Sequence, residues 1–192
     1  MSADRLGLAA DRGATHQIGT IRPAMPIRPI LVADEPILRE RTKRVPSFDA
    51  GLHRLLDDML VTMRDAPGVG LAANQVGVGL QVAVIEVEGR ITELVNPQVV
   101  KSSGEQVDWE GCLSIPGYVA EVTRAAKVTV KAKDRHGREF RVKGEGLFAR
   151  ALQHEIDHLN GGLYIDLLGP DDELVRVSEA HDEVSEETAA SI

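Results

Sequence analysis

Residues 153–158 read Gln-His-Glu-Ile-Asp-His, an HExxH pattern inside a stretch of helical periodicity, and this stretch decides the fold. Successive helical residues are rotated by about 100°, so His154 and His158 project from one face and can bind one cation. Glu155 points towards the same side and stays free for proton transfer. We therefore expect this helix to form the centre of a metal site.

The only cysteine of the chain, Cys112, lies upstream in Glu-Gly-Cys-Leu-Ser, residues 110–114. A catalytic metal usually takes three protein ligands and leaves one position open for water. The helix supplies two ligands, and Cys112 is the best candidate for the third. The alternatives stay open here, since paired histidines also occur as surface or core residues and a lone cysteine is usually a small buried hydrophobe.

A third segment, residues 68–75, reads Gly-Val-Gly-Leu-Ala-Ala-Asn-Gln and is a poor helix start. The motifs GxGLAAxQ, EGCLS and QHExDHL, in this order, are those of the peptide deformylases, and the chain closely resembles that family. The resemblance runs from about residue 27 to residue 168. It implies an α+β fold in which antiparallel sheets pack around a central HExxH metal-binding helix.

The resemblance also implies the activity, which is removal of the N-formyl group from the initiator methionine of newly synthesised polypeptides, with release of formate. It implies three metal ligands, namely Cys112, His154 and His158. Glu155 is implied as the general acid/base and a metal-bound water as the nucleophile. The Gln75 amide and the backbone N–H of Leu113 are implied as donors that stabilise the oxyanion.

The cofactor implied by the resemblance is one divalent metal per chain, typically Fe(II), with Zn(II), Ni(II) or Co(II) able to occupy the same site. Gly70 is implied to line the substrate backbone through its carbonyl. A methionine side chain needs an apolar pocket, and we expect Val69, Leu71 and Leu147 to contribute to it. Ordinary core packing is the alternative for each of these three residues.

Composition indicates a cytoplasmic protein with one catalytic domain. The chain has 192 residues, 43% of them hydrophobic, and no apolar run long enough for a bilayer span or a signal peptide. One cysteine excludes an internal disulfide. The net charge of −8 argues against chain-wide binding of nucleic acid, although local basic patches are compatible with it.

Three regions are expected along the chain. Residues 1–26 lack periodicity and are predicted to be a peripheral extension, and residues 27–168 are predicted to be the catalytic domain. Residues 169–192 are rich in Asp and Glu and are predicted to be a solvated acidic tail. Some deformylases dock on the ribosome through a basic C-terminal helix, but RNA phosphates would repel this tail, so we do not expect docking through it.

Periodicity predicts an amphipathic helix after the cap candidates Ser47 and Asp49, ending at Pro67, and a second helix over residues 146–160, ended by Gly161 and Gly162. Alternating or β-branched runs predict the strands between them. These predicted strands cover residues 81–86, 91–95, 106–109, 118–123, 127–133 and 139–143.

Two positions depart from the family pattern. Val119 stands where many bacterial members have an arginine, which puts one polar contact at the edge of the pocket in doubt. Arg150 stands where a hydrophobic residue is common. It either borders the cleft or lies on the helix surface, and of these we expect the surface.

Two other functions remain as alternatives. A zincin-like metalloendopeptidase would need a third ligand downstream of the helix, and only Glu173 and His181 are near enough in sequence. A non-catalytic metal-binding module would need neither Glu155 nor Gln75, yet the chain has both. The deformylase function is therefore preferred.

Overall fold

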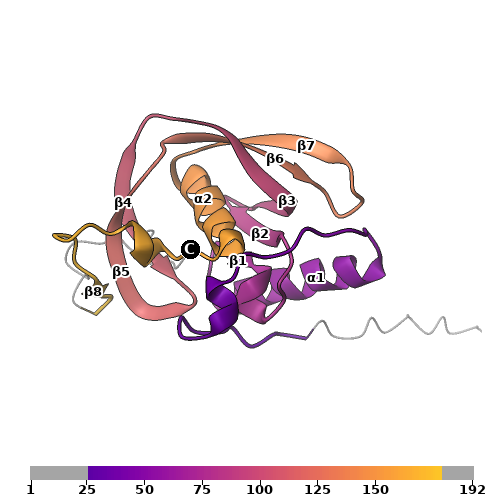
Figure 1. Cartoon of the computed structure of the whole chain (residues 1–192), viewed down its shortest axis with the longest axis horizontal. Coiled ribbons are helices and arrows are strands. Elements are labelled where there is room, and N and C mark those ends of the chain that lie inside the picture. Colours follow the sequence, from indigo (N-terminus) through magenta and orange to yellow (C-terminus); the bar gives the residue numbers. More distant parts are fainter. Residues whose placement is uncertain (1–25, 179–192) are drawn as a thin grey trace, which may run out of the picture.

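The computed structural model describes residues 26–178, which form two antiparallel sheets and two α-helices (Figure 1). The α+β class predicted from the sequence is confirmed. The predicted N-terminal extension lies, apart from its last residue, outside the described residues. Among the residues described, no helix is long and apolar enough to cross a membrane.

Helix α1 (Ala50–Asp65) begins where the sequence predicts. Its N-cap is Asp49, whose carboxylate accepts hydrogen bonds from the backbone N–H groups of Gly51 and Leu52. The apolar stripe of the helix is buried against one face of the larger sheet, with Leu56, Met59 and Met63 fully inaccessible to solvent.

The larger sheet has five strands in the order β1-β2-β3-β6-β7. These are β1 (Gly70–Ala72), β2 (Val82–Val87), β3 (Arg90–Ser103), β6 (Lys127–Lys133) and β7 (Glu139–Glu145). In β2, residues on both faces are buried, because α1 covers one side and helix α2 covers the other. Helix α1 covers the β1–β2 half of its face, so one side of β6 and β7 stays exposed.

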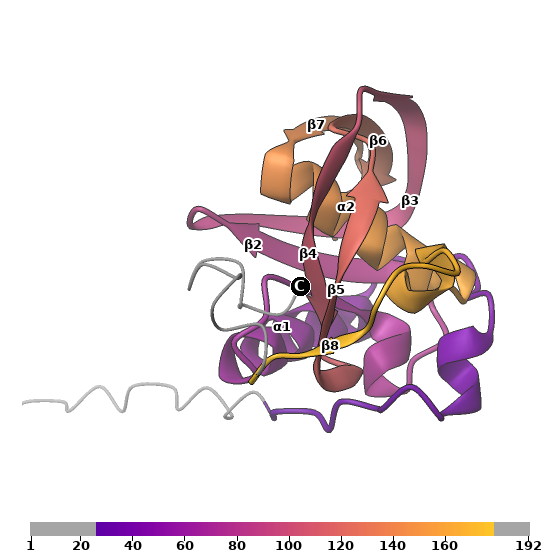
Figure 2. The same ribbon diagram turned by 90° about the vertical axis from the view of Figure 1, so that its left-hand side faces the viewer.

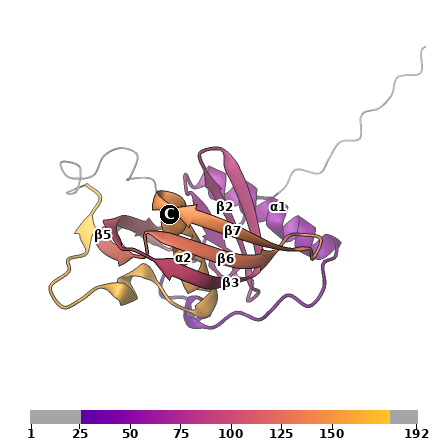
Figure 3. The same ribbon diagram turned by 90° about the horizontal axis from the view of Figure 1, so that it is seen from above.

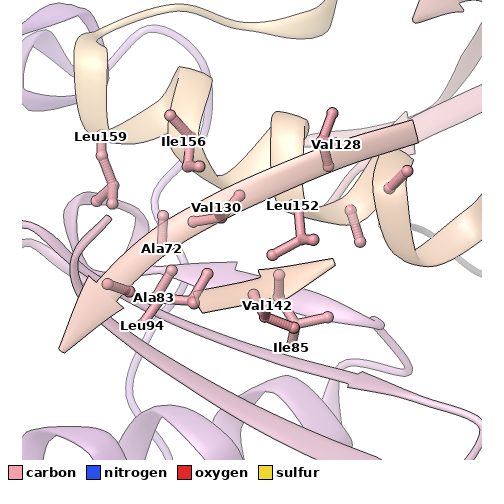
Figure 4. Packing of buried hydrophobic residues seen from close by; sticks show 13 residues of the cluster. Ala72, Ala83, Ile85, Leu94, Val128, Val130, Val142, Leu152, Ile156 and Leu159 are labelled. Atoms are coloured by element: carbon pink, nitrogen blue, oxygen red, sulfur yellow. The ribbon is translucent and has the colours of Figure 1, made fainter. Parts of the chain in front are cut away.

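Helix α2 (Gly146–Asn160) carries the HExxH sequence and packs on the opposite face of the sheet from α1. Figure 4 shows Leu152, Ile156 and Leu159 directed from α2 into the apolar side chains of the sheet. The helix ends at Gly161, which adopts a left-handed conformation with φ of 85°, as the sequence predicts. Three short 3-10 helices complete the described helices: η1 (Pro36–Arg39), η2 (Ala73–Val76) and η3 (Tyr164–Leu167).

The smaller sheet contains β4 (Gln106–Cys112), β5 (Ile115–Arg124) and β8 (Val175–Arg176). Figure 2 shows β4 and β5 as a long hairpin beside α2, with β8 along its edge. Strand β8 pairs with Tyr118 and Val119, so the first part of the segment predicted as an acidic tail belongs to this sheet. The boundaries of the catalytic domain remain a prediction.

Strand β3 is much longer than predicted, and Asn96 explains why. In the sequence, Pro97 breaks the strand pattern because it has no backbone N–H to donate. In the structure, Asn96 before it adopts a left-handed conformation with φ of 54°. A register shift between Val95 and Gln98 takes both residues out of the ladder, and pairing with β6 then resumes. The buried Asn96 amide bonds both the N–H and the carbonyl of Val45, at 2.8 and 3.1 Å.

Replacing Asn96 with Ala is expected to lower the free energy of unfolding by about 3 kcal/mol, because two buried backbone groups of Val45 lose their partners and Ala tolerates positive φ poorly. Asn96→Gly removes the same bonds without the backbone strain, so it should still lower the free energy of unfolding, by about 2 kcal/mol. Urea denaturation measures both variants. An unchanged midpoint for Asn96→Ala would contradict the role of this amide.

Candidate metal centre and active site

Three ligand atoms converge where the end of β4 meets α2. Cys112, His154 and His158 are buried, and their ligand atoms all lie within 4.8 Å of one another. The Nε2 atom of His158 lies 3.2 Å from Cys112 Sγ and 3.2 Å from His154 Nε2. Two nitrogens that share a tetrahedral cation at 2.0–2.1 Å are separated by about 3.3 Å, so this arrangement fits a divalent metal such as zinc or iron.

The charges of the two imidazoles are set by their surroundings. Burial, together with the neighbouring His154, lowers the pKa of His158 to about 3. The His158 ring is therefore neutral and can offer a nitrogen lone pair to a metal. Burial alone would lower the pKa of His154, but hydrogen bonds to Cys112 and Glu110 raise it well above its ordinary value. Since His154 donates a hydrogen bond from Nδ1 to Glu110, its Nε2 atom faces the cluster.

Glu110 is completely buried and accepts four hydrogen bonds, which fills its acceptor capacity. His154 Nδ1 donates to it at 2.6 Å, Arg124 donates through Nε and a terminal nitrogen at 3.0 and 2.6 Å, and Arg150 donates at 2.7 Å. Burial tends to raise the pKa of Glu110, but the donors from His154 and Arg124 lower it far below its ordinary value. The carboxylate is therefore ionised and fixes the orientation of His154.

Glu155 has the opposite environment. Both of its carboxylate oxygens are buried and lack a hydrogen-bond partner among the described residues. Burial raises the pKa of Glu155 to about 7, so its carboxyl group can gain or lose a proton near neutral pH. Gly70 leaves room for it, since a Cβ atom on Gly70 would lie 2.2 Å from Glu155 Oε1.

Gln75 lies beside the cluster in a fixed orientation. Its Oε1 accepts the backbone N–H of Ala72 at 2.8 Å, so its Nε2 must point to the other side, where Ser114 Oγ lies at 3.2 Å and Cys112 Sγ at 3.7 Å. The N-terminal segment holds this loop and the cysteine turn together, because Leu31 N donates to the carbonyl of Gln75 and Ala33 N donates to that of Ser114.

Comparison with known proteins decides the family. The family profile described as Polypeptide deformylase matches residues 27–173. The chain belongs to this family. A peptide deformylase of Dehalococcoides mccartyi strain CBDB1 is 48% identical over 165 residues, which cover 85% of this chain and 98% of that protein. One from Heliobacterium modesticaldum is 52% identical over 142 residues, 74% of this chain and 94% of that protein.

Solved deformylase structures agree in fold as well as in sequence. A crystal structure of a peptide deformylase from Legionella pneumophila superposes with a TM-score of 0.74 at 51% identity, covering 76% of this chain and 88% of that one. The peptide deformylase from Thermotoga maritima gives the same TM-score at 38% identity, covering 76% and 99%. The resemblance drawn from the three motifs is thereby confirmed.

The residues predicted to form the deformylase substrate pocket do not all lie together. Gly70 adjoins Glu155, and Val69 packs beside the apolar side chains of α2. Leu147, 45% exposed, lies in the first turn of α2. Leu71 is fully buried in the cluster under α1, on the other face of β1 from Glu155, so its position favours core packing over pocket lining.

Arg150 was expected on the helix surface, and this prediction is wrong. The side chain is 1% exposed and donates to Glu110 at 2.7 Å. Its Nε and second terminal nitrogen are buried without a partner among the described residues, a cost that the ion pair with Glu110 must offset. Val119, the second departure from the family pattern, is buried in β5 and pairs with β8.

The peptidase alternative needs a third metal ligand downstream of the helix, and the described part of the chain has none beside the histidines. Glu173 is exposed and lines a surface pocket with Trp109 and Glu121, away from the histidines. His181 lies outside the described residues. Cys112, in contrast, adjoins both histidines, so the geometry favours it as the third ligand.

Sequence reasoning missed the network around Glu110. A signal for Glu110 was present, since it precedes Cys112 by two residues in a strand and therefore shares its face. No local signal marks Arg124, which reaches Glu110 only after β5 has paired with β4 and which also donates to Asp157. The same applies to Tyr164, which stacks on His154 with ring centroids 6.3 Å apart.

Replacing Glu110 with Gln is expected to lower the free energy of unfolding by about 3–5 kcal/mol, because Arg150 would remain buried without a counter-charge and Arg124 would keep only Asp157. Affinity for Co(II), measured by competition with a chelator, should fall about 10–100-fold because His154 loses its orienting carboxylate. Glu86→Gln removes a surface ion pair with Arg64 and should cost less than about 1 kcal/mol. Equal effects of the two substitutions would contradict the role assigned to Glu110.

Proposed function

We propose that this chain is a metal-dependent peptide deformylase that removes the N-formyl group from the initiator methionine of newly synthesised polypeptides and releases formate. The observation that carries this proposal is the buried convergence of Cys112, His154 and His158 beside the unpaired carboxylate of Glu155, in a chain of the deformylase family. The proposed domain is residues 27–168, acting in the cytoplasm, where the formylated chains are made.

Helix α2 is the proposed metal-binding helix. Cys112, His154 and His158 would hold one divalent cation per chain, and Fe(II) is the proposed metal, with Zn(II), Ni(II) or Co(II) as other occupants. One thiolate with two imidazoles is a donor set that suits these metals better than Mg²⁺ or Ca²⁺. Bound there, the cation would supply Lewis acidity, which polarises a carbonyl and makes water more acidic.

Glu155 is the proposed general acid/base. Its carboxylate would take a proton from the attacking water and deliver it to the departing amine of the peptide. A pKa of about 7 suits both steps, since the group then gains and loses a proton at similar cost near neutral pH. The absence of a hydrogen-bond partner among the described residues keeps both oxygens available for this transfer.

Gln75 and Leu113 are the proposed donors to the oxyanion. The amide of Gln75 is held by Ala72, so its N–H groups point towards the cluster before any substrate binds. Leu113 directly follows Cys112 in the turn between β4 and β5, which supports the proposal that its backbone N–H serves the same cluster. Donors that are oriented in advance stabilise the charge developing on the formyl oxygen, by about 3 kcal/mol each.

The formylated chain is proposed to lie along β1, an edge strand of the larger sheet. The carbonyl of Gly70 would accept a hydrogen bond from the peptide backbone, as in β-strand addition. Val69 and Leu147 remain the proposed apolar contacts for the methionine side chain. Leu71 is not retained in this role, because its side chain is buried under α1.

Glu155→Gln should lower the turnover of a formyl-methionyl tripeptide by about 10²–10⁴-fold, because the proton carrier is lost while the shape of the side chain is kept. Formate release by anaerobically prepared Fe(II) protein is the measurement, with metal content determined for each sample. Glu86→Gln serves as the matched surface control and should retain full turnover. Absence of formate release from the parent protein with one metal per chain would refute the deformylase proposal.

Gly70→Ala should leave the fold intact and lower turnover at least about tenfold, because the new methyl group would displace the Glu155 carboxylate from its position. Metal content should stay at that of the parent. Gly79→Ala is the control, since a Cβ atom at Gly79 has no atom within 4 Å. Full turnover in Gly70→Ala would show that the position of Glu155 relative to β1 is unimportant.

A further inference from the structure

One side of the larger sheet carries an unusual concentration of positive charge. Because side chains alternate along a strand, Val128 and Val130 of β6 face α2, whereas Lys127, Thr129 and Lys131 face the opposite side. Figure 3 looks onto β3, β6 and β7 from this side. We define the basic face by five of the cations on this side: Lys101, Lys127, Lys131, Arg141 and Lys143.

The basic face is not neutralised by its own carboxylates. Lys127 pairs with Glu145 at 3.0 Å and Lys131 pairs with Glu139 at 2.9 Å, both as exposed pairs of the kind that contribute little. The other three cations have no carboxylate within ion-pair distance in the described part of the chain. This excess is local, since the whole chain has a net charge of −8.

The cations of the basic face also lie close to one another. Lys131 lies directly opposite Arg141 in the β6–β7 register, and like charges at opposed positions are unfavourable. Lys101 and Lys143 flank Thr129 from the two neighbouring strands. Neighbouring strands are about 4.8 Å apart, so these two lysine backbones are separated by about 10 Å and their ammonium groups share one region of space.

A shallow pocket of about 240 Å³ lies in this region. Lys101, Lys127 and Lys143 line it together with the hydroxyl residues Ser103 and Thr129, and its one carboxylate, that of Glu145, is paired with Lys127. Ammonium and hydroxyl groups are typical donors to phosphate oxygens. The strands offer no surface for base stacking, because Phe140, the only aromatic residue in β3, β6 and β7, packs towards the α2 core.

We propose that the basic face binds the phosphate backbone of double-helical RNA. Phosphate contacts without stacking side chains suit a helix whose bases remain paired, whereas single strands are normally bound on aromatic platforms. The choice of RNA over DNA rests on the proposed function, since a newly synthesised polypeptide is still close to the RNA of the translation machinery. The proposal departs from the expectation of no nucleic-acid binding, which followed from net charge alone.

The position of the basic face is compatible with catalysis. Helix α2 separates it from the cysteine of β4, so RNA bound there would leave the cluster of Cys112, His154 and His158 uncovered. Carboxylates gather elsewhere, around the surface pocket that contains Glu121, Asp172 and Glu173. Repulsion of phosphates from that side would orient the molecule with its basic face towards the RNA.

The test is binding of a fluorescein-labelled RNA duplex of about 20 base pairs, followed by anisotropy over a series of KCl concentrations. Each phosphate neutralised contributes about 0.9 to the slope of log affinity against log salt for a double helix, so four contacts give a slope of about −4. In the double variant Lys101→Glu/Lys143→Glu, affinity should fall at least about tenfold and the slope should become shallower.

The matched control is Arg41→Glu/Arg44→Glu, which changes the net charge equally at exposed positions outside the basic face. It should bind RNA like the parent protein. Formate release from a small formyl peptide should be the same in both double variants and the parent, which separates failure of this proposal from failure of the deformylase function. The proposal would be overturned if the two double variants lost RNA affinity equally, or if the parent protein bound duplex DNA as tightly as duplex RNA. It would also be overturned if the parent bound polyglutamate more tightly than RNA, or did not bind RNA at about 0.1 M salt.

Discussion

The candidate site depends on one buried carboxylate, that of Glu110. A charged group removed from water is stable only when its hydrogen-bonding capacity is filled, and Glu110 receives four donors from three side chains. Those side chains come from β5 and α2, whereas Glu110 itself belongs to β4. The β4–β5 hairpin and the helix on the larger sheet are thus joined by charge at the point where Cys112 meets the two histidines.

Local signals explain how much of the fold could be predicted from the sequence. The two helices and most strands follow from periodicity and caps that lie within one segment, such as Asp49 before α1 and Gly161 after α2. The short strands β1 and β8 were missed, because three and two residues cannot establish a period and are ordered only by pairing with distant strands. Strand β3 was cut short because its left-handed Asn96 is stabilised by Val45, far away in the sequence.

In the site too, local spacing was predictable from the sequence, whereas contacts between distant segments were not. The sequence brings His154 and His158 together through helical spacing, and the structure places Cys112 beside them, while their role as ligands stays a prediction. Arg150 was misplaced because a charged residue is normally expected at the surface unless a buried partner is known. That partner, Glu110, is 40 residues away and its burial cannot be read from either segment. For Leu71 the sequence left pocket lining and core packing open, because strand β1 was not recognised and the face of its side chain was therefore unknown.

Two buried glutamates with opposite environments connect this architecture to the proposed chemistry. Glu110 is saturated with donors, and its pKa lies far below the ordinary value despite burial. Glu155, on the neighbouring helix, has no partner among the described residues, and burial raises its pKa to about 7. Because the two environments shift the pKa values of these carboxyl groups in opposite directions, one glutamate keeps a permanent charge and the other can carry a proton. The fixed charge orients His154, and the carboxyl group without a hydrogen-bond partner is the one proposed as the proton carrier.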